Sequence, residues 1–255
     1  LRHTVEPTVQ HGGQHKVRPP AVSNLQSAQQ APATHHSGAA AEHREEATAL
    51  LSAAYFPPVQ WFQKLHRHRR CVIDTGEHFV KQTYRNRCII ATANGTQTLT
   101  VPTERQAGTK TAMHDTRISD HGEWRHLHWN ALVSAYGESP FFDYYADDLR
   151  PFFEERYESL AEFDIAITMK LCQLLDVRPD ITVSDTYVDA EALAEATGHE
   201  VADFREAIRP KNAPADAAFT PHPYYQVYAR RHGFQPNMSV ADLLFNEGPE
   251  GIFYL

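Results

Sequence analysis

A dense group of charged side chains between residues 74 and 87 carries the most chemistry in this sequence. Asp74 ends a short apolar run rich in β-branched residues, and Lys81, Arg85 and Arg87 follow closely along the chain. Arginine holds an oxyanion with two parallel hydrogen bonds, and Glu77 or His78 of the same segment can take part in proton transfer. This combination predicts a site for an anionic substrate group. The alternative is a solvated face whose ion pairs contribute little stability.

His128 and Tyr55 are two further candidates. His128 shares a helical face with Trp124 and Ala135, so we expect its ring to point inward, where a lone histidine is more often a core residue than a catalyst. Tyr55 opens the turn Tyr-Phe-Pro-Pro directly after a predicted strand. Ligands of open α/β sheets bind outside such strand ends. For Tyr55 the alternative is aromatic packing around a proline-braced turn.

Metal ligands and nucleophiles follow no recognisable spacing. The cysteines Cys71, Cys88 and Cys172 lack the CxxC spacing of a metal site. The first two fall inside predicted strands, where thiols are usually buried and inert. The sequence therefore predicts no metal site, and it leaves the cofactor unknown.

The candidate residues need a scaffold, and the first part of the chain provides a strand–helix–strand pattern. An apolar run at 49–54 is followed by Val59, Phe62 and Leu65 at helical spacing, and then by the run 71–74. This order predicts two parallel strands joined by a right-handed crossover.

The rest of the chain predicts a hairpin and then helices. Asn94-Gly95 between two β-prone runs predicts a hairpin with a type I′ turn. We therefore expect an α/β fold with a Rossmann-like parallel core, a β-hairpin insertion and a helical C-terminal half, with α+β as the alternative. The later elements expected are a helix capped by Asp120 and Glu123, a helix opened by Pro151 with its apolar stripe at 160–174, a strand at 181–184 and acidic helices over 189–209.

Composition divides the chain into two parts. Residues 1–47 are rich in His, Gln, Ala and Pro without apolar periodicity, which predicts a disordered tail, whereas residues 48–255 form the domain. The net charge of −8 argues against nucleic-acid binding. No run approaches the ~18 apolar residues of a membrane span, and the N-terminus lacks a signal-like apolar stretch. We expect a cytoplasmic protein whose oligomeric state is unknown.

Several short motifs follow one another in a fixed order along residues 48–255. They are Tyr55-Phe56-Pro57-Pro58, Trp61-Phe62, Lys64, Asp74, Lys81, Arg85-Asn86-Arg87, Leu99-Thr100-Val101-Pro102, Trp124, His128, Tyr136, Pro140-Phe141-Phe142 and the ending from Pro236 to Pro249. In this order they resemble the WbqC-like protein family, in the form seen in Bacteroidetes-type bacteria.

The resemblance implies a role in surface polysaccharide or O-antigen biosynthesis. The leading expectation is a transferase that moves an amino-acid (glycine-like) or other acyl group to a sugar, so the partner would be a small-molecule or sugar-linked substrate. The alternative is a non-catalytic binding or assembly protein of the same pathway. For the enzyme we expect Asp74 and His128 to be catalytic. The residues expected to bind the substrate are Tyr55, Lys81, Arg85, Asn86, Arg87 and Glu247.

One stretch departs from the family pattern. Many members carry His-Gln-Pro ahead of the aromatic-proline turn, whereas this chain has Ser52-Ala53-Ala54 there. If that histidine is catalytic elsewhere, this chain has lost it or uses another, such as His78 or His128.

Overall fold

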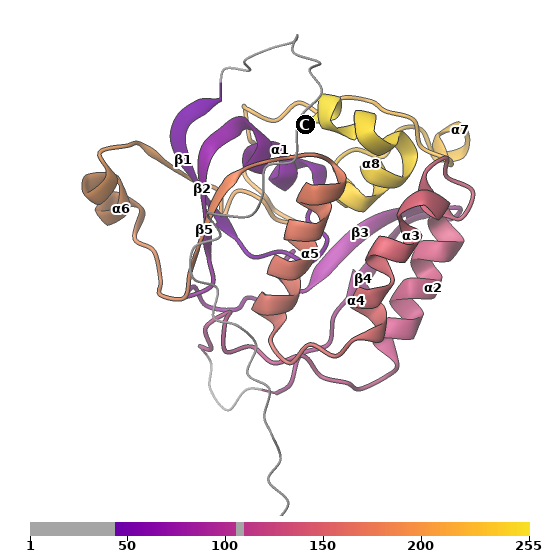
Figure 1. The fold of residues 1–255 in the computed structure, drawn as a ribbon, viewed down its shortest axis with the longest axis horizontal. Coiled ribbons are helices and arrows are strands. Elements are labelled where there is room, and N and C mark those ends of the chain that lie inside the picture. Colours follow the sequence, from indigo (N-terminus) through magenta and orange to yellow (C-terminus); the bar gives the residue numbers. More distant parts are fainter. Residues whose placement is uncertain (1–43, 106–109) are drawn as a thin grey trace, which may run out of the picture. The chain divides into compact units, whose positions relative to one another are not determined.

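The structure is a computed structural model that describes residues 44–105 and 110–255 (Figure 1). Nearly all of the predicted tail lies outside the described residues. The predicted domain boundary at residue 48 falls within the first strand, which begins at Glu45.

A four-stranded parallel sheet in the order β5-β2-β1-β6 is the centre of the α/β fold. Helix α1 links β1 to its parallel neighbour β2, so the predicted strand–helix–strand unit is confirmed, and with it the α/β fold class. The elements of this layer are β1 (Glu45–Ser52), α1 (Val59–Arg67), β2 (His68–Asp74), β5 (Asp180–Ser184) and β6 (Val201–Asp203).

The sequence of β1 explains its place inside the sheet. Ala49, Leu50 and Leu51 are fully buried in succession, as expected for a parallel strand covered on both faces. At the carboxyl end of the sheet, Ser52 lies opposite Asp74 in the β1–β2 register, and Asp74 lies opposite Ser184 in the β2–β5 register. The register therefore places three polar side chains in one row at this end.

The predicted hairpin is confirmed, but its turn type is not. Strands β3 (Arg87–Thr92) and β4 (Gly95–Thr100) pair antiparallel, with Thr92 opposite Gly95. Of the Asn94-Gly95 pair, only the glycine has a positive φ, at 107°, whereas a type I′ turn needs two such residues. The loop is instead Ala93-Asn94, and the glycine directly after it takes the backbone conformation that a side chain disfavours.

Two helix starts differ from the prediction. Helix α2 (Trp124–Tyr136) has Glu123 rather than Asp120 as its N-cap, and the Asp120 carboxylate binds Arg125 and Arg156 instead. The helix opened by Pro151 is the short α4 (Pro151–Glu154), and the apolar stripe belongs to a separate helix, α5 (Leu160–Leu174), which begins at its own serine N-cap.

The segment 189–209 is only partly helical. Gly198 ends helix α6 in a left-handed conformation, and the next residues form β6, the edge strand beside β1. The prediction of helices throughout this segment was therefore wrong. The remaining helices are α3 (Phe142–Leu149), α6 (Ala190–Thr197), α7 (Ala229–His232), α8 (Val240–Glu247) and the 3-10 helix η1 (Gly248–Tyr254).

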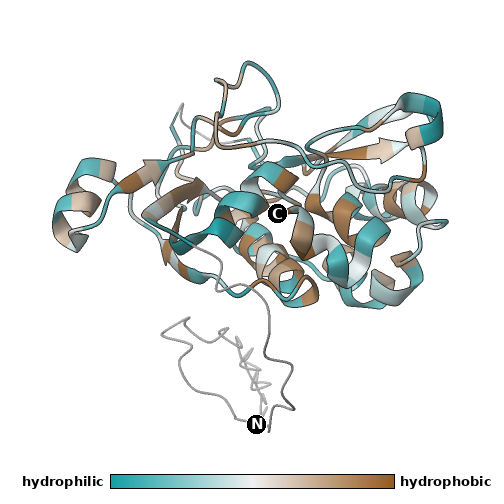
Figure 2. Ribbon diagram, turned by 90° about the horizontal axis from the view of Figure 1, so that it is seen from above, coloured by the Kyte–Doolittle hydropathy of each residue, from teal (hydrophilic) through white to brown (hydrophobic). Residues whose placement is uncertain are grey.

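The hydrophobic core joins the sheet to the helices. Helix α5 stands between the parallel sheet and the α2–α4 group in Figure 1, and it contacts α3 and α8. Hydrophobic residues concentrate where these elements meet (Figure 2), and the cluster includes Ile73, Ile90, Phe163 and Leu244. No helix in the described part of the chain is long and apolar enough to cross a membrane.

The three cysteines are buried and unpaired, as predicted for those in the strands. Burial raises the pKa of Cys71 and of Cys172 to about 12, and it raises the pKa of Cys88 further. All three thiols are therefore protonated and shielded in the folded protein.

Candidate functional site

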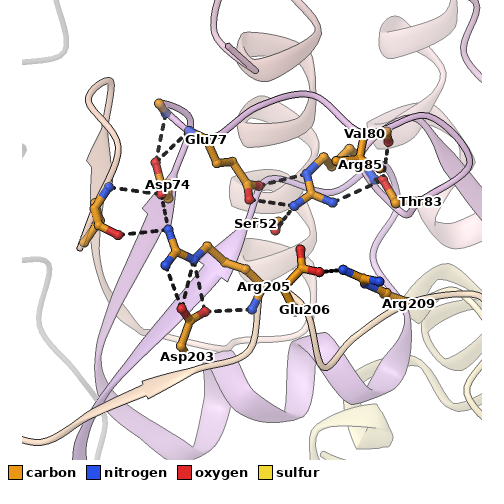
Figure 3. A network of polar contacts seen from close by, with 12 residues as sticks. Ser52, Asp74, Glu77, Val80, Thr83, Arg85, Asp203, Arg205, Glu206 and Arg209 are labelled. Atoms are coloured by element: carbon orange, nitrogen blue, oxygen red, sulfur yellow. Dashed lines mark hydrogen bonds and ion pairs between the residues drawn. The ribbon is translucent and has the colours of Figure 1, made fainter. Parts of the chain in front are cut away.

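The carboxyl ends of β1, β2 and β6 define the candidate site. The chain places β2 on one side of β1 and β6 on the other, so the strand order reverses at β1. In open α/β sheets, ligands bind outside the carboxyl ends of the strands at such a reversal. The polar residues at and after these ends form what we call the carboxyl-edge network (Figure 3). Its members are Ser52, Asp74, Glu77, Thr83, Arg85, Asp203 and Arg205.

Asp74 is fully buried, and four donors surround its carboxylate. Oδ1 accepts hydrogen bonds from the backbone amides of Gly76 (2.9 Å) and Glu77 (3.1 Å). Oδ2 accepts from the Val188 amide (3.2 Å) and from Nη1 of Arg205 (2.5 Å). Asp74 therefore fixes the turn after β2 and ties it to the segment before α6.

Arg205 is the cation that neutralises this buried carboxylate. Its guanidinium also binds both oxygens of Asp203 and the carbonyl of Val188. Burial lowers the pKa of Arg205, but the hydrogen bonds with Asp203 and Asp74 outweigh it and raise the pKa overall. The ring of Tyr187, which is 64% exposed, lies 4.9 Å from the guanidinium. An exposed aromatic ring thus borders the buried ion pairs.

A second ion pair reaches the end of β1. Nε and Nη2 of Arg85 bind the two carboxylate oxygens of Glu77 at 2.9 and 2.6 Å, and both side chains are buried. Nη2 also donates to Oγ of Ser52 at 2.9 Å, and Nη1 donates to Thr83. Ser52 is only partly buried, so it is the accessible end of this chain of contacts.

The turn between the two ion pairs depends on Gly76. A Cβ atom at this position would collide with the backbone of Thr186 and Tyr187. The Thr75 amide next to it donates to the Ser184 carbonyl at 2.8 Å. Close backbone packing therefore holds the residues after β2 against those after β5.

Tyr55 and His128 form a separate buried pair. The Tyr55 hydroxyl lies 2.9 Å from Nδ1 of His128, and the Tyr55 amide donates to the Tyr84 carbonyl, next to Arg85. Burial lowers the pKa of His128 to about 4, although a backbone hydrogen bond with Thr100 acts in the opposite direction. Burial also raises the pKa of Tyr55 well above its usual value. Both rings are therefore neutral at pH 7, and the predicted inward orientation of His128 is confirmed.

The other predicted site residues lie in different surroundings. Lys81 is exposed in the loop after β2, and Asn86 donates to the Val101 carbonyl inside the protein. Arg87 is half-buried at the start of β3, and its Nε has no hydrogen-bond partner among the described residues. Glu247 ends α8 and accepts from the Tyr225 amide at 2.7 Å. Of the predicted residues, the carboxyl-edge network thus contains Asp74 and Arg85.

Sequence reasoning did not propose Ser52, Thr83, Asp203 or Arg205 of the network, nor a buried acid on α5. Asp203 and Arg205 fall in the segment that was predicted to be helical, so their position at a strand end was hidden. Asp164 lies on the apolar face of α5 and is fully buried, with no hydrogen-bond partner for either oxygen among the described residues. Burial raises the pKa of Asp164 well above its usual value, which favours the protonated form. A lone acid inside an apolar stripe was the signal that could have revealed it.

The described residues do not assemble a metal centre. Residues 44–105 and 110–255 contain no group of three or more His, Cys, Asp or Glu side chains that could hold a metal ion. The carboxylates of the carboxyl-edge network instead bind arginines.

The fold and the network define an α/β protein with a buried charge network at the carboxyl edge of its parallel sheet. The chain belongs to the WbqC-like protein family, whose pattern matches residues 53–254. A similar protein is the uncharacterised protein Rv1507c of Mycobacterium tuberculosis, with 25% identity over 224 residues, which cover 81% of this chain and 96% of that protein. No solved structure matches the chain.

Proposed function

We propose that this chain is a transferase of surface-polysaccharide biosynthesis that attaches an amino-acid or other acyl group to a sugar. Membership of the WbqC-like family suggests a role in polysaccharide biosynthesis. The observation that carries the proposal is Ser52, a partly exposed residue at the strand-order reversal, whose hydroxyl accepts a hydrogen bond from Arg85 of the buried pair with Glu77. Preorganised polar groups at such a position are what acyl transfer requires.

The chemistry follows from the direction of the hydrogen bonds. A sugar oxygen or nitrogen attacks the carbonyl carbon of an activated acyl group, and the bond to the leaving group then breaks with its electron pair. The proton of the sugar group passes to the leaving group or to a base. Because Arg85 donates to Oγ of Ser52, the hydroxyl hydrogen of Ser52 can point to the carbonyl oxygen on which negative charge develops. Glu77 and Arg85 are then positioning residues.

The predicted catalytic roles of Asp74 and His128 remain proposals. Asp74 binds Arg205 and His128 binds Tyr55, so each would act on a substrate through its partner. The exposed Tyr187 ring beside Arg205 offers a surface on which a sugar or a nucleobase can stack. Lys81, Arg87 and Glu247 remain proposed substrate-binding residues outside the network.

The test uses the full chain with acetyl and glycyl thioesters and a set of nucleotide-sugars, followed by mass spectrometry of the sugar. We expect an acylated sugar from the parent. Loss of one oxyanion donor in Ser52→Ala should lower the rate about 10²–10³-fold. Ser134→Ala, on the exposed side of α2, is the matched control and should keep the parent rate. Full activity of Ser52→Ala, or no acylated product from the parent, would overturn the proposal.

A non-catalytic binding protein of the same pathway is the second candidate. The observation that favours it is that Arg85 and Arg205 are both held by carboxylates of the protein itself. An anionic substrate group would have to compete with these internal partners. In this case the full chain forms no product in that experiment but binds one of the nucleotide-sugars in a calorimetric titration.

A further inference from the structure

A cleft between the start of α2 and the short helix α4 lies outside the carboxyl-edge network. Its cavity volume is about 410 Å³, within the ~300–1,000 Å³ typical of small-molecule sites. We call it the α2–α4 cleft. We propose that it binds a neutral sugar unit of the saccharide on which the proposed transferase acts. The inference rests on the proposed function only for the expectation that a sugar is the substrate.

Aromatic rings form one part of the cleft wall. Trp124, Trp129 and Phe153 all line it, and the rings of Trp129 and Phe153 lie 5.6 Å apart. Trp129 is only partly buried, whereas the Arg125 guanidinium lies over Trp124 at 4.7 Å. The Trp129 ring is therefore the aromatic surface best placed to receive the apolar C–H face of a sugar ring.

The charged groups of the cleft balance one another. Arg125 and Arg156 both bind Asp120, and Arg150 binds Glu154 at 2.6 Å. With Glu123, the lining contains three arginines and three carboxylates, so its formal charge is zero when His126 is neutral. A phosphate or carboxylate ligand would find no net positive charge here, unlike at a typical anion site.

The same side chains suit a ring of hydroxyl groups. Each sugar hydroxyl donates one hydrogen bond and accepts others, so it needs both carboxylates and guanidinium groups nearby. Nη2 of Arg125 is enclosed by the protein, so the accessible guanidinium groups of the lining are those of Arg150 and Arg156, whose side chains are exposed. A flat aromatic surface beside paired donors and acceptors therefore fits a neutral sugar better than an apolar ligand, which would leave these groups unpaired.

The test measures binding alone, by calorimetry and by tryptophan fluorescence. The full chain is titrated with neutral trisaccharides of glucose, mannose and galactose, and with inorganic pyrophosphate as the anionic probe. We expect at least one trisaccharide to bind and pyrophosphate not to bind at the cleft. Trp129→Ala should weaken the trisaccharide at least about tenfold. Tyr144→Ala, which removes a 75% exposed ring on α3, is the matched control and should bind as the parent does.

A second variant keeps the test decisive if Trp129→Ala does not fold, since Trp129 also packs against Phe142. Glu123→Gln changes an exposed side chain and should weaken the trisaccharide several-fold with unchanged thermal stability. The proposal is overturned if none of the trisaccharides binds with Kd below about 10 mM, or if neither variant alters binding. It is also overturned if pyrophosphate binds and Arg156→Ala abolishes that binding. Because no product is measured, failure here is distinct from failure of the transferase assay.

Discussion

The carboxyl-edge network and the α2–α4 cleft use the same residue types in opposite ways. At the edge, the side chain of Arg205 is 7% exposed and that of Asp74 is fully buried. At the cleft, the side chains of Arg150 and Glu154 are 56% and 58% exposed. The buried pair holds two strand ends together, whereas the exposed pair is screened by water and leaves its groups available to a ligand.

The buried network is therefore suited to positioning groups of the protein, whereas the exposed cleft is suited to recognising a ligand. A buried charge that loses its partner is costly, so the edge network can fix the backbone around Ser52 but cannot easily release an arginine. The cleft can exchange its weak internal ion pairs for contacts to a sugar at little cost. The variants below test this contrast, from the largest expected effect to the smallest.

Arg205→Met should cause the largest loss of stability. It leaves the fully buried Asp74 without its cation, so the free energy of unfolding should fall by about 3–5 kcal/mol in urea denaturation. Arg178→Met breaks the exposed pair with Asp176 and should change the free energy of unfolding by less than about 0.5 kcal/mol. Equal effects of the two variants would remove the distinction between buried and exposed pairs.

His128, on the inner side of α2, should make the free energy of unfolding depend on pH. Its ring lies 5.2 Å from the ring of Trp124, which lines the cleft. The pKa of His128 is about 4 in the folded protein and about 6.5 in the unfolded chain, so folding favours the neutral ring. The resulting stability is complete above pH ~6.5 and is lost as the pH falls towards 4, by up to about 3 kcal/mol. The measurement is the difference in unfolding free energy between the parent and His128→Gln, taken from pH 7 to pH 4. A constant difference would contradict a neutral buried histidine.

Gly76→Ala tests the packing of the edge itself. The added methyl group collides with the backbone of Thr186 and Tyr187, so we expect a cost on the order of 1–3 kcal/mol. Gly122→Ala, near the cleft, is a useful comparison because its Cβ meets no atom within 4 Å and only its φ of 85° is unfavourable. If Gly76→Ala is the less costly of the two in thermal melts, the edge is looser than the geometry indicates.

Arg150→Gln should have the smallest effect. Its partner Glu154 is one helical turn away and exposed, so the loss should be about 0.3–0.5 kcal/mol. Chemical denaturation at low and high salt provides the measurement, and salt should remove even this small difference. A loss comparable with that of Arg205→Met would show that the cleft is held together by its charges.

The sequence predicts the fold better than it predicts the site. Local patterns identify β1, α1, β2 and the hairpin because the periodicity of a strand or a helix depends on residues that are close together in the sequence. They do not reveal that β6 pairs with β1, since three residues of strand inside an acidic segment carry almost no pattern.

The same limit applies to the site. Asp74 and Arg85 were selected because they stand close together in a charged segment, and both lie in the network. Their partners differ in how far away they are: Glu77 lies 8 residues from Arg85, but Arg205 lies 131 residues from Asp74. Only the folded sheet brings Arg205 to Asp74. The α2–α4 cleft likewise combines residues before and within the first half of α2 with residues around α4, and no local sequence motif identifies it.

The burial of the three thiols also has a practical consequence. Cys71 lies in the middle of β2, Cys88 in the hairpin and Cys172 in α5, and none reacts readily while its region stays closed. The rate at which each sulfur is alkylated therefore reports how often that part of the protein opens. Without any introduced label, the chain carries three natural probes of local unfolding, which can be read separately by peptide mapping.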